Sequence, residues 1–407
     1  MSASSPVLAE HGLTRRQLVA WRNAVFLIFL LPGLAFATWA SRIPAVRDSL
    51  GASTDQMGVI LAGIAVGSVS GLLLSGRIVA RLGARPTMLV TLSAAMAGLV
   101  VAGLGASAGA FWVVFAGLAL FGAGSGICDV AMNVSGAANE RALGRNVMPI
   151  FHAFFSFGTM LGAGLGALAE ALDVPISVHL AIVAAVVVVG LFIGARPLQS
   201  EHIGTPAAEP AAPGSSGRPR LRLDLATMLI GLVVLGAAFS EGTANDWLTL
   251  AMVDGHEISK EGGALVLGAF LTAMTAGRLL GVRALDRWGR VPVVRSSFGL
   301  AAVGLLAVIF APDPALAVVG AVLWGLGSAL GFPVGMSAAA DDPAKAAARV
   351  GAVATIGYLA FLVGPPVIGF LGEQLGILLA LLVVLVLVLV GGLVSGAVRE
   401  PRRTPSE

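Results

Sequence analysis

Long apolar runs alternate along the chain with short breaks that contain charged residues, proline or glycine. Runs of about 20 residues match the ~30 Å hydrocarbon core of a bilayer, and they lack the alternating polar positions of membrane β-strands. The pattern predicts an all-α membrane protein with twelve transmembrane helices. The expected spans are 22–42, 56–78, 86–105, 111–138, 147–171, 176–195, 225–246, 262–283, 292–311, 315–338, 348–372 and 376–397.

One long polar stretch, residues 196–224, separates the sixth predicted span from the seventh. Its Pro, Gly, Ser and Ala content leaves too little apolar surface to offset the entropy of ordering, which indicates a flexible linker. The expected organisation is a cytoplasmic tail (1–21), a six-helix bundle (22–195), a cytoplasmic linker (196–224), a second six-helix bundle (225–397) and a second tail (398–407).

Composition and charge agree with a membrane location. The chain is 57% hydrophobic and 12% charged, whereas soluble domains are about 25% charged. Basic residues gather in the breaks on one side, and the other side receives only Arg42, Arg47 and Lys260. This bias predicts that both termini lie inside the bacterial cytoplasmic (inner) membrane. It also explains the net charge of +3 without a nucleic-acid partner.

The two halves share a repeated pattern. Eight positions recur at a displacement of 206 residues, and they lie around the second and eighth predicted spans. The pairs are Leu61/Leu267, Gly71/Gly277, Leu73/Leu279, Leu74/Leu280, Arg77/Arg283, Arg81/Arg287, Gly83/Gly289 and Pro86/Pro292. A parallel repeat of this kind predicts two similar bundles with a binding site where they meet.

At these positions the chain resembles the major facilitator superfamily over almost its whole length. The family's signature loop, Gly-x-x-x-Asp-Arg-x-Gly-Arg-Arg, is matched in part by each copy. The first copy has Gly76, Arg81, Gly83 and Arg85 but carries Ala80 in place of the Asp; the second has Asp286, Arg287, Gly289 and Arg290. The resemblance implies a cytoplasmic latch with Arg81, Asp286, Arg287 and Arg290 as gating residues. In this latch Asp286 would dock at the start of the fifth span, near Asn146 and Pro149.

Three short runs narrow the resemblance. The runs 39–44, 129–133 and 151–155 are similar to the YbjJ/MosC-like inner-membrane proteins. The fourth span also resembles the fucose permeases, in which an acid and an Asn line a sugar and proton site. The first span departs from those permeases, because Arg42 stands where they carry an acid.

Ionisable groups inside a span are costly and therefore mark candidate functional sites. The substrate- and proton-binding candidates are Asp129, Asn133, His152, Glu241 and Asn245, and Arg42 and Arg278 are further gating candidates. Counting ~1.5 Å per residue places the first three and Arg278 in the cytoplasmic half, and the others in the outer half. We therefore expect Arg42 and Glu241 to approach each other when the outer gate closes. The alternative is that Arg42 and Asp246, a further ionisable residue within a span, only lie at the membrane interface beside Trp39 and Trp247. Arg42 could there also pair with Asp48 or Asp246.

The predicted function is secondary active transport of a small organic solute, such as a sugar or polyol, by alternating access coupled to protons in symport. A proton-driven exporter of amphipathic compounds is the alternative, favoured by glycines of the fifth span and by Gly364, Pro365 and Pro366. A receptor or channel has no sensor domain or filter motif in its favour. No metal cluster or catalytic spacing suggests an enzyme or a cofactor. The expected partners are the solute, protons and the lipid bilayer, and the expected state is a monomer.

Overall fold

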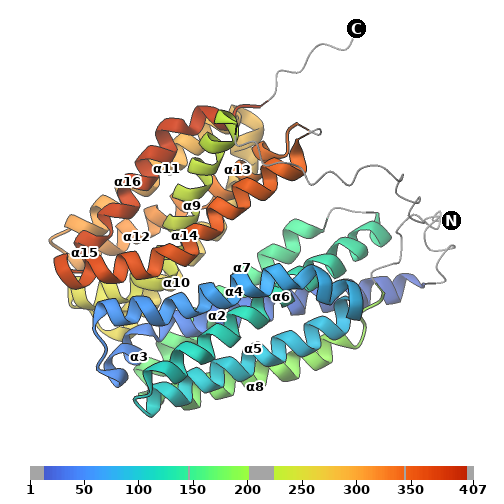
Figure 1. Cartoon of the computed structure of the whole chain (residues 1–407), viewed down its shortest axis with the longest axis horizontal. Coiled ribbons are helices and arrows are strands. Elements are labelled where there is room, and N and C mark those ends of the chain that lie inside the picture. Colours follow the sequence, from blue (N-terminus) through green and yellow to red (C-terminus); the bar gives the residue numbers. More distant parts are fainter. Residues whose placement is uncertain (1–12, 145–146, 201–223, 343–344, 401–407) are drawn as a thin grey trace, which may run out of the picture. The chain divides into compact units, whose positions relative to one another are not determined.

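The computed structural model describes residues 13–144, 147–200, 224–342 and 345–400, and these residues form helices without any strand (Figure 1). The helices of the first half are α2 (Arg15–Ser41), α3 (Ile43–Leu50), α4 (Thr54–Leu82), α5 (Ala84–Ser107), α6 (Phe111–Leu143), α7 (Met148–Ala171) and α8 (Ile176–Ala195). Those that follow are α9 (Leu225–Leu250), the π-helix η1 (Ala251–Gly255), α10 (Lys260–Trp288), α11 (Arg290–Phe310), α12 (Pro314–Ser328), α13 (Gly331–Ala339), α14 (Ala346–Leu375), α15 (Ile377–Ala380), α16 (Leu382–Leu393) and the 3₁₀-helix η2 (Val394–Val398).

Twelve segments of these helices are long and apolar enough to cross a membrane, as the sequence predicts. Their ends differ from the predicted ones where polar residues continue a helix. α2 begins at Arg15 because Thr14 and Gln17 form a capping box, with each side chain accepting from the other's backbone N–H. The seventh span runs to Gly255, beyond the predicted end at 246, and the tenth is broken between α12 and α13. Most of the predicted linker, and the outer parts of both tails, lie outside the described residues.

The described chain divides into two compact units. The first contains the residues up to Gly51 and those from Gly63 to Ser200. The second contains Ala52–Ala62 and the residues from Asp224 onward. The first turns of α4 therefore belong with the second unit. There the Thr54 N–H donates to Glu373 on α14 over 2.9 Å.

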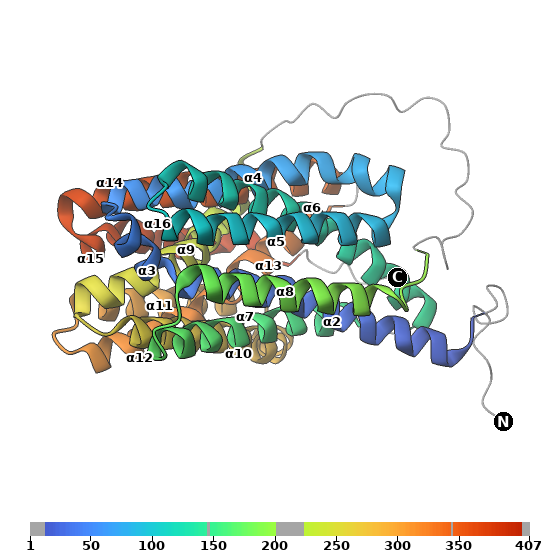
Figure 2. The same ribbon diagram turned by 90° about the horizontal axis from the view of Figure 1, so that it is seen from below.

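Glycines bring helix backbones together in the first unit. A Cβ at Gly158 of α7 would overlap the carbonyl oxygen of Leu30 on α2, and a Cβ at Gly162 would overlap that of Leu34. α4 and α6 meet through a similar series that includes Gly67. α5 packs against α6 and α8 (Figure 2). Small residues at such contacts permit close approach, which is how membrane helices associate.

The α9–α14 pair of the second unit is packed differently. Gly242 of α9 lies against the Phe361 ring, and Gly364 of α14 lies against the Phe239 ring. Side chains rather than backbones therefore fill this contact. α14 also contains Pro365 and Pro366, which cannot donate backbone hydrogen bonds within the helix.

Candidate functional site

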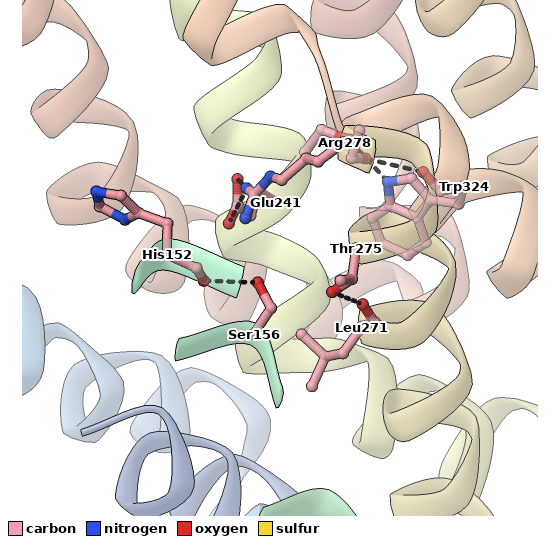
Figure 3. Close-up of polar contacts among 9 residues, drawn as sticks. His152, Ser156, Glu241, Leu271, Thr275, Arg278 and Trp324 are labelled. Atoms are coloured by element: carbon pink, nitrogen blue, oxygen red, sulfur yellow. Dashed lines mark hydrogen bonds and ion pairs between the residues drawn. The ribbon is translucent and has the colours of Figure 1, made fainter. Parts of the chain in front are cut away.

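An ion pair lies deep in the spans of the second unit. Arg278 Nη2 donates to Glu241 Oε1 over 3.1 Å and to Oε2 over 3.0 Å (Figure 3). The side chains retain 36% and 22% of their exposure, respectively. The pair is therefore compensated in charge but still accessible at its edge, so its remaining donors and acceptors are available to a polar solute.

A buried hydrogen-bond network fixes α9 beside this pair. Trp324 Nε1 donates to Ser240 Oγ over 2.7 Å, and Ser240 and Ser328 share a hydrogen bond of 2.9 Å. Ser328 Oγ in turn donates to the Trp324 carbonyl oxygen. Ser240 directly precedes Glu241, so the network holds the neighbouring carboxylate in place. Trp324 and Ser328 lie on α12, close to the break before α13, and Ser240 lies on α9. The sequence did not indicate this network, because serines and tryptophans are common inside spans.

The contact between Glu241 and Arg278 corrects the predicted depths. Residue counting placed Glu241 in the outer half and Arg278 in the cytoplasmic half, but groups 3.0 Å apart lie at one level. The error came from the seventh span, which extends to Gly255 and places Glu241 near its middle. The two predicted polar layers are therefore wrong for this pair.

Asn245 lies one turn after Glu241 on the same face of α9. Its residue exposure is 8%, and its Oδ1 has no hydrogen-bond partner among the described residues. A buried amide oxygen without a donor is costly. Asn245 therefore offers an unused acceptor beside the ion pair.

In the first unit, Asp129 and Asn133 share a face of α6, as their spacing predicts. Asn133 Nδ2 donates to the Asp129 carbonyl oxygen over 2.8 Å and to Oδ1 over 3.3 Å. The Asp129 side chain is exposed on the surface of the unit. His152 is also exposed, on α7, where its ring meets the edge of Phe29.

Arg42 occupies a buried position inside the first unit. It lies at the junction of α2 and α3 with 3% exposure. Its Nε is 3.2 Å from Glu170 Oε1, and its Nη2 donates to the Val174 carbonyl oxygen over 2.7 Å. The Arg42 side chain is thus a tie between α2 and the end of α7. The expected approach to Glu241 would require Arg42 and Glu241 each to leave an existing partner. Both predictions for Arg42 stay predictions, because burial among helices does not fix its depth in the membrane.

Glu170 could have been found from the sequence. Arg42 ends the first predicted span and Glu170 ends the fifth, and both of these ends were expected on the outer side. Opposite charges at neighbouring span ends on one side are candidates for pairing.

Most of the predicted latch residues lie at the surface and not in the interior of a unit. Arg81, Asp286 and Arg287 are exposed, and the Arg287 guanidinium lies over the Trp288 ring. Arg290 is the most strongly bound. Its guanidinium donates to Asp341 over 2.5 Å and 3.1 Å and to Ser337 over 3.0 Å.

The start of α7, where the latch acid was expected to dock, has an acid of its own. Glu140 Oε2 accepts from the N–H groups of Val147 and Met148 over 2.6 Å and 2.7 Å. Pro149 has no N–H to offer. The nearest donors at this helix start are therefore already used within the first unit. The docking of Asp286 there stays a prediction. Asn146 lies outside the described residues.

A cavity of about 560 Å³ lies at the loop between α4 and α5, and it is lined by Arg81, Arg85 and Ser200 among others.

Among the described residues, no group of three or more His, Cys, Asp or Glu side chains is placed to hold a metal ion.

Comparison with known proteins places the chain among transporters. The profile of the Major Facilitator Superfamily matches residues 230–407, and that of sugar (and other) transporters matches residues 25–196. An uncharacterized transporter of Sinorhizobium fredii is 33% identical over 365 residues, covering 88% of this chain and 93% of the relative. Membrane protein MosC of Rhizobium meliloti is 27% identical over 361 residues, covering 87% and 84%.

Solved structures share the fold at low sequence identity. The nucleoside transporter NupG, in a mutant form, matches with a TM-score of 0.74 and 14% identity, covering 94% of this chain and 99% of that one. The E. coli fucose:proton symporter FucP, also a mutant, matches with a TM-score of 0.63 and 15% identity, covering 95% and 100%. With the close relative in Sinorhizobium, these findings show that the chain belongs to the major facilitator superfamily.

Proposed function

We propose that this protein is a secondary active transporter that moves a small polar solute of the sugar, polyol or nucleoside kind by alternating access, with coupling to protons. The observation that carries the proposal is the Glu241–Arg278 pair, which lies deep in two spans and keeps part of its surface accessible. Charged groups in such positions are expensive in a membrane and mark solute or ion pathways.

The chemistry of the surrounding groups suits a solute with several hydroxyl groups. Glu241 and the Asn245 Oδ1 accept hydrogen bonds, and Arg278 donates them. In the first unit, Asp129, Asn133 and His152 supply similar groups. The printed names of structural neighbours, a nucleoside transporter and a fucose:proton symporter, support this class of solute.

Other parts of the proposal concern location and gating. We place the protein in the cytoplasmic membrane with both termini inside, because basic residues gather in the predicted inner loops. The proposed state is a monomer. Arg81, Asp286, Arg287 and Arg290 then lie on the cytoplasmic side. Of these we assign the tie that supports closure to Arg290, because it binds Asp341.

Export of amphipathic compounds is a second candidate. It is favoured by α14, whose Pro365 and Pro366 weaken the helix and whose contact with α9 is made by side chains. Such a contact can be repacked to admit a larger molecule more easily than a backbone contact can.

Uptake by proteoliposomes distinguishes a transporter of polar solutes from an exporter of amphipathic compounds. Labelled uridine, L-fucose and D-glucose, and the amphipathic cation ethidium, are offered with and without an imposed pH gradient. We expect at least one of the three polar solutes to accumulate under the gradient, and Glu241→Gln to reduce its accumulation at least tenfold. Glu261→Gln, an exposed acid at the start of α10, is the matched control and should leave uptake unchanged. Movement of ethidium alone would establish the exporter, and movement of none of the four would contradict transport of these classes.

A further inference from the structure

Three acids of the described spans lie more than two helical turns from either end of their span: Asp129, Glu241 and Asp246. The first two have partners, because Asn133 donates to Asp129 and Arg278 donates to Glu241. Asp246 has no hydrogen bond or ion pair with any described residue, and it is only partly exposed, between fully buried neighbours on α9. Asp246 therefore differs from Asp129 and Glu241, because it has no partner among the described residues.

Charged groups elsewhere in the second unit do not compensate Asp246. The elements packed against α9 are α10, α12, α13, α14, α16, η1 and η2, and α12, α13, α16 and η2 contain no charged residue. The charged residues of the others are Lys260, Glu261, Arg278, Arg283, Asp286 and Arg287 on α10, Arg349 and Glu373 on α14, and Asp254 on η1. None of these residues forms an ion pair or hydrogen bond with Asp246.

The position of Asp246 on α9 faces the deformable contact with α14. Phe239 and Gly242 of α9 meet α14, and Asp246 follows them by seven and four residues, which places it on the same face. One turn later the helix changes to the π form over Ala251–Gly255. Single π turns inside α-helices frequently accompany functional sites.

A carboxylate in such surroundings has one inexpensive way to become neutral. Without a cation or a set of donors, burial strongly favours the protonated acid over the carboxylate. When the α9–α14 contact opens to water, the same group is solvated and can release its proton.

We propose that Asp246 is a proton-binding site of this protein: its carboxylate takes up one proton from water to form a carboxylic acid while buried, and returns that proton to water when α9 and α14 separate. The O–H bond forms and breaks without any other reactant. The role of this proton in driving solute movement rests on the proposed function, whereas the binding of the proton does not.

Infrared spectroscopy of the protein in proteoliposomes detects this state directly, because a protonated carboxylic acid has a C=O stretching band that a carboxylate lacks. We expect a band from a protonated acid at neutral pH that titrates away on raising the pH. Asp246→Asn should remove this band, and Asp246→Glu should restore it at a shifted frequency. Glu241→Gln, which removes the acid that is paired with Arg278, is the control and should leave the band in place. An unchanged band in a folded Asp246→Asn protein would overturn the proposal.

Transport assays distinguish proton binding by Asp246 from a role of that proton in driving solute movement. With uridine or L-fucose as the probe, Asp246→Asn should lose accumulation driven by a pH gradient while it keeps exchange of solute across the membrane. Accumulation that persists in a variant without the band would overturn the coupling role. If the wild-type protein moves neither solute but shows the band, the proposed substrate class fails and the proton site stands.

Discussion

The α2–α7 pair of the first unit and the α9–α14 pair of the second hold corresponding places in the repeat but are joined in different ways. Gly158 and Gly162 bring α7 directly against the backbone of α2 at two positions, and aromatic rings such as Phe26 and Phe151 fill the contact toward the start of α7. Phenylalanine rings separate α9 from α14, and two prolines interrupt the hydrogen bonds of α14. Close-packed backbones transmit motion as a rigid body, whereas a side-chain contact can repack. We infer that the first unit is the stiffer of the two.

The ion pairs of the two units also differ, in how far they are enclosed and in where they lie along their helices. Arg42 and Glu170 are nearly enclosed, with side-chain exposures of 4% and 12%, and lie at the ends of their helices. Glu241 and Arg278 are more open and lie deep in their spans. The first pair is placed to hold helices together, and the second is placed to meet a solute.

Replacement of Arg42 should have the largest effect, and it tests whether the two ion pairs have different roles. Arg42→Gln leaves Glu170 without its cation, and removal of one partner of a buried pair costs roughly 3–5 kcal/mol. Thermal unfolding in detergent should show this loss, and the added change Glu170→Gln should recover part of it. Arg278→Gln is the matched variant and should cost less stability, because its partner can be solvated. Equal losses from both arginine variants would remove the distinction between the pairs.

A methyl group at the α2–α7 contact tests the stiffness of the first unit. Gly158→Ala places a Cβ against the Leu30 carbonyl oxygen, and overpacking of this kind costs about 1–3 kcal/mol. Gly164→Ala, in the same helix but with no atom within 4 Å of the added Cβ, should be neutral or slightly stabilising. Gly364→Ala, whose nearest neighbour is 3.6 Å away, should resemble that control. If all three variants unfold at the same temperature, the glycine contact does not stiffen the first unit.

The smallest effect concerns the tie between the first turns of α9 and α14. The Thr227 hydroxyl, the Arg349 guanidinium and the Thr227 N–H lower the pKa of Asp224 from its usual value. A lowered pKa stabilises the folded state above the unfolded pKa, near about 3.9, and this stabilisation disappears as the pH falls below it. Asp224→Asn keeps a capping side chain but does not titrate. The stability advantage of the wild type over this variant should therefore shrink between about pH 5 and pH 3; an advantage that does not change with pH would contradict the pairing.

Much of the fold could be predicted from the sequence because membrane crossing imposes a length and a polarity on each helix. The twelve spans and the family are both confirmed. The break between α12 and α13 and the π-helix at Ala251–Gly255 were not predicted, since both are local departures from a helical pattern that remains apolar throughout.

Partners of charged residues were harder to predict than their presence. The sequence identified Arg42, Glu241 and Arg278 as costly groups, but the choice of partner depends on which helices are neighbours and at what depth. Residue counting from apolar runs missed the true ends of the seventh span and so misplaced Glu241. Glu140 shows the same limit, because its hydrogen bonds to the start of α7 depend on a turn geometry that composition does not report.

If the Glu241–Arg278 pair meets a solute, water must reach it from a pathway inside the membrane. Chemical labelling tests it without knowledge of the solute, because maleimides react with ionised thiols and therefore in water. Cys128 is the only cysteine in the chain, so Cys128→Ala provides a background. Thr275→Cys then places a thiol one turn from Arg278 on the same face of α10 (Figure 3).

Val303→Cys is the matched control, since Val303, Leu306 and Phe310 form an exposed apolar stripe on α11 that is expected to face lipid. In proteoliposomes, we expect N-ethylmaleimide to label Thr275→Cys at least tenfold faster than Val303→Cys. Addition of Glu241→Gln, which frees Arg278, should change the rate at position 275 and leave position 303 unaffected. Equal, slow labelling at both positions would contradict a water-filled pathway at the ion pair.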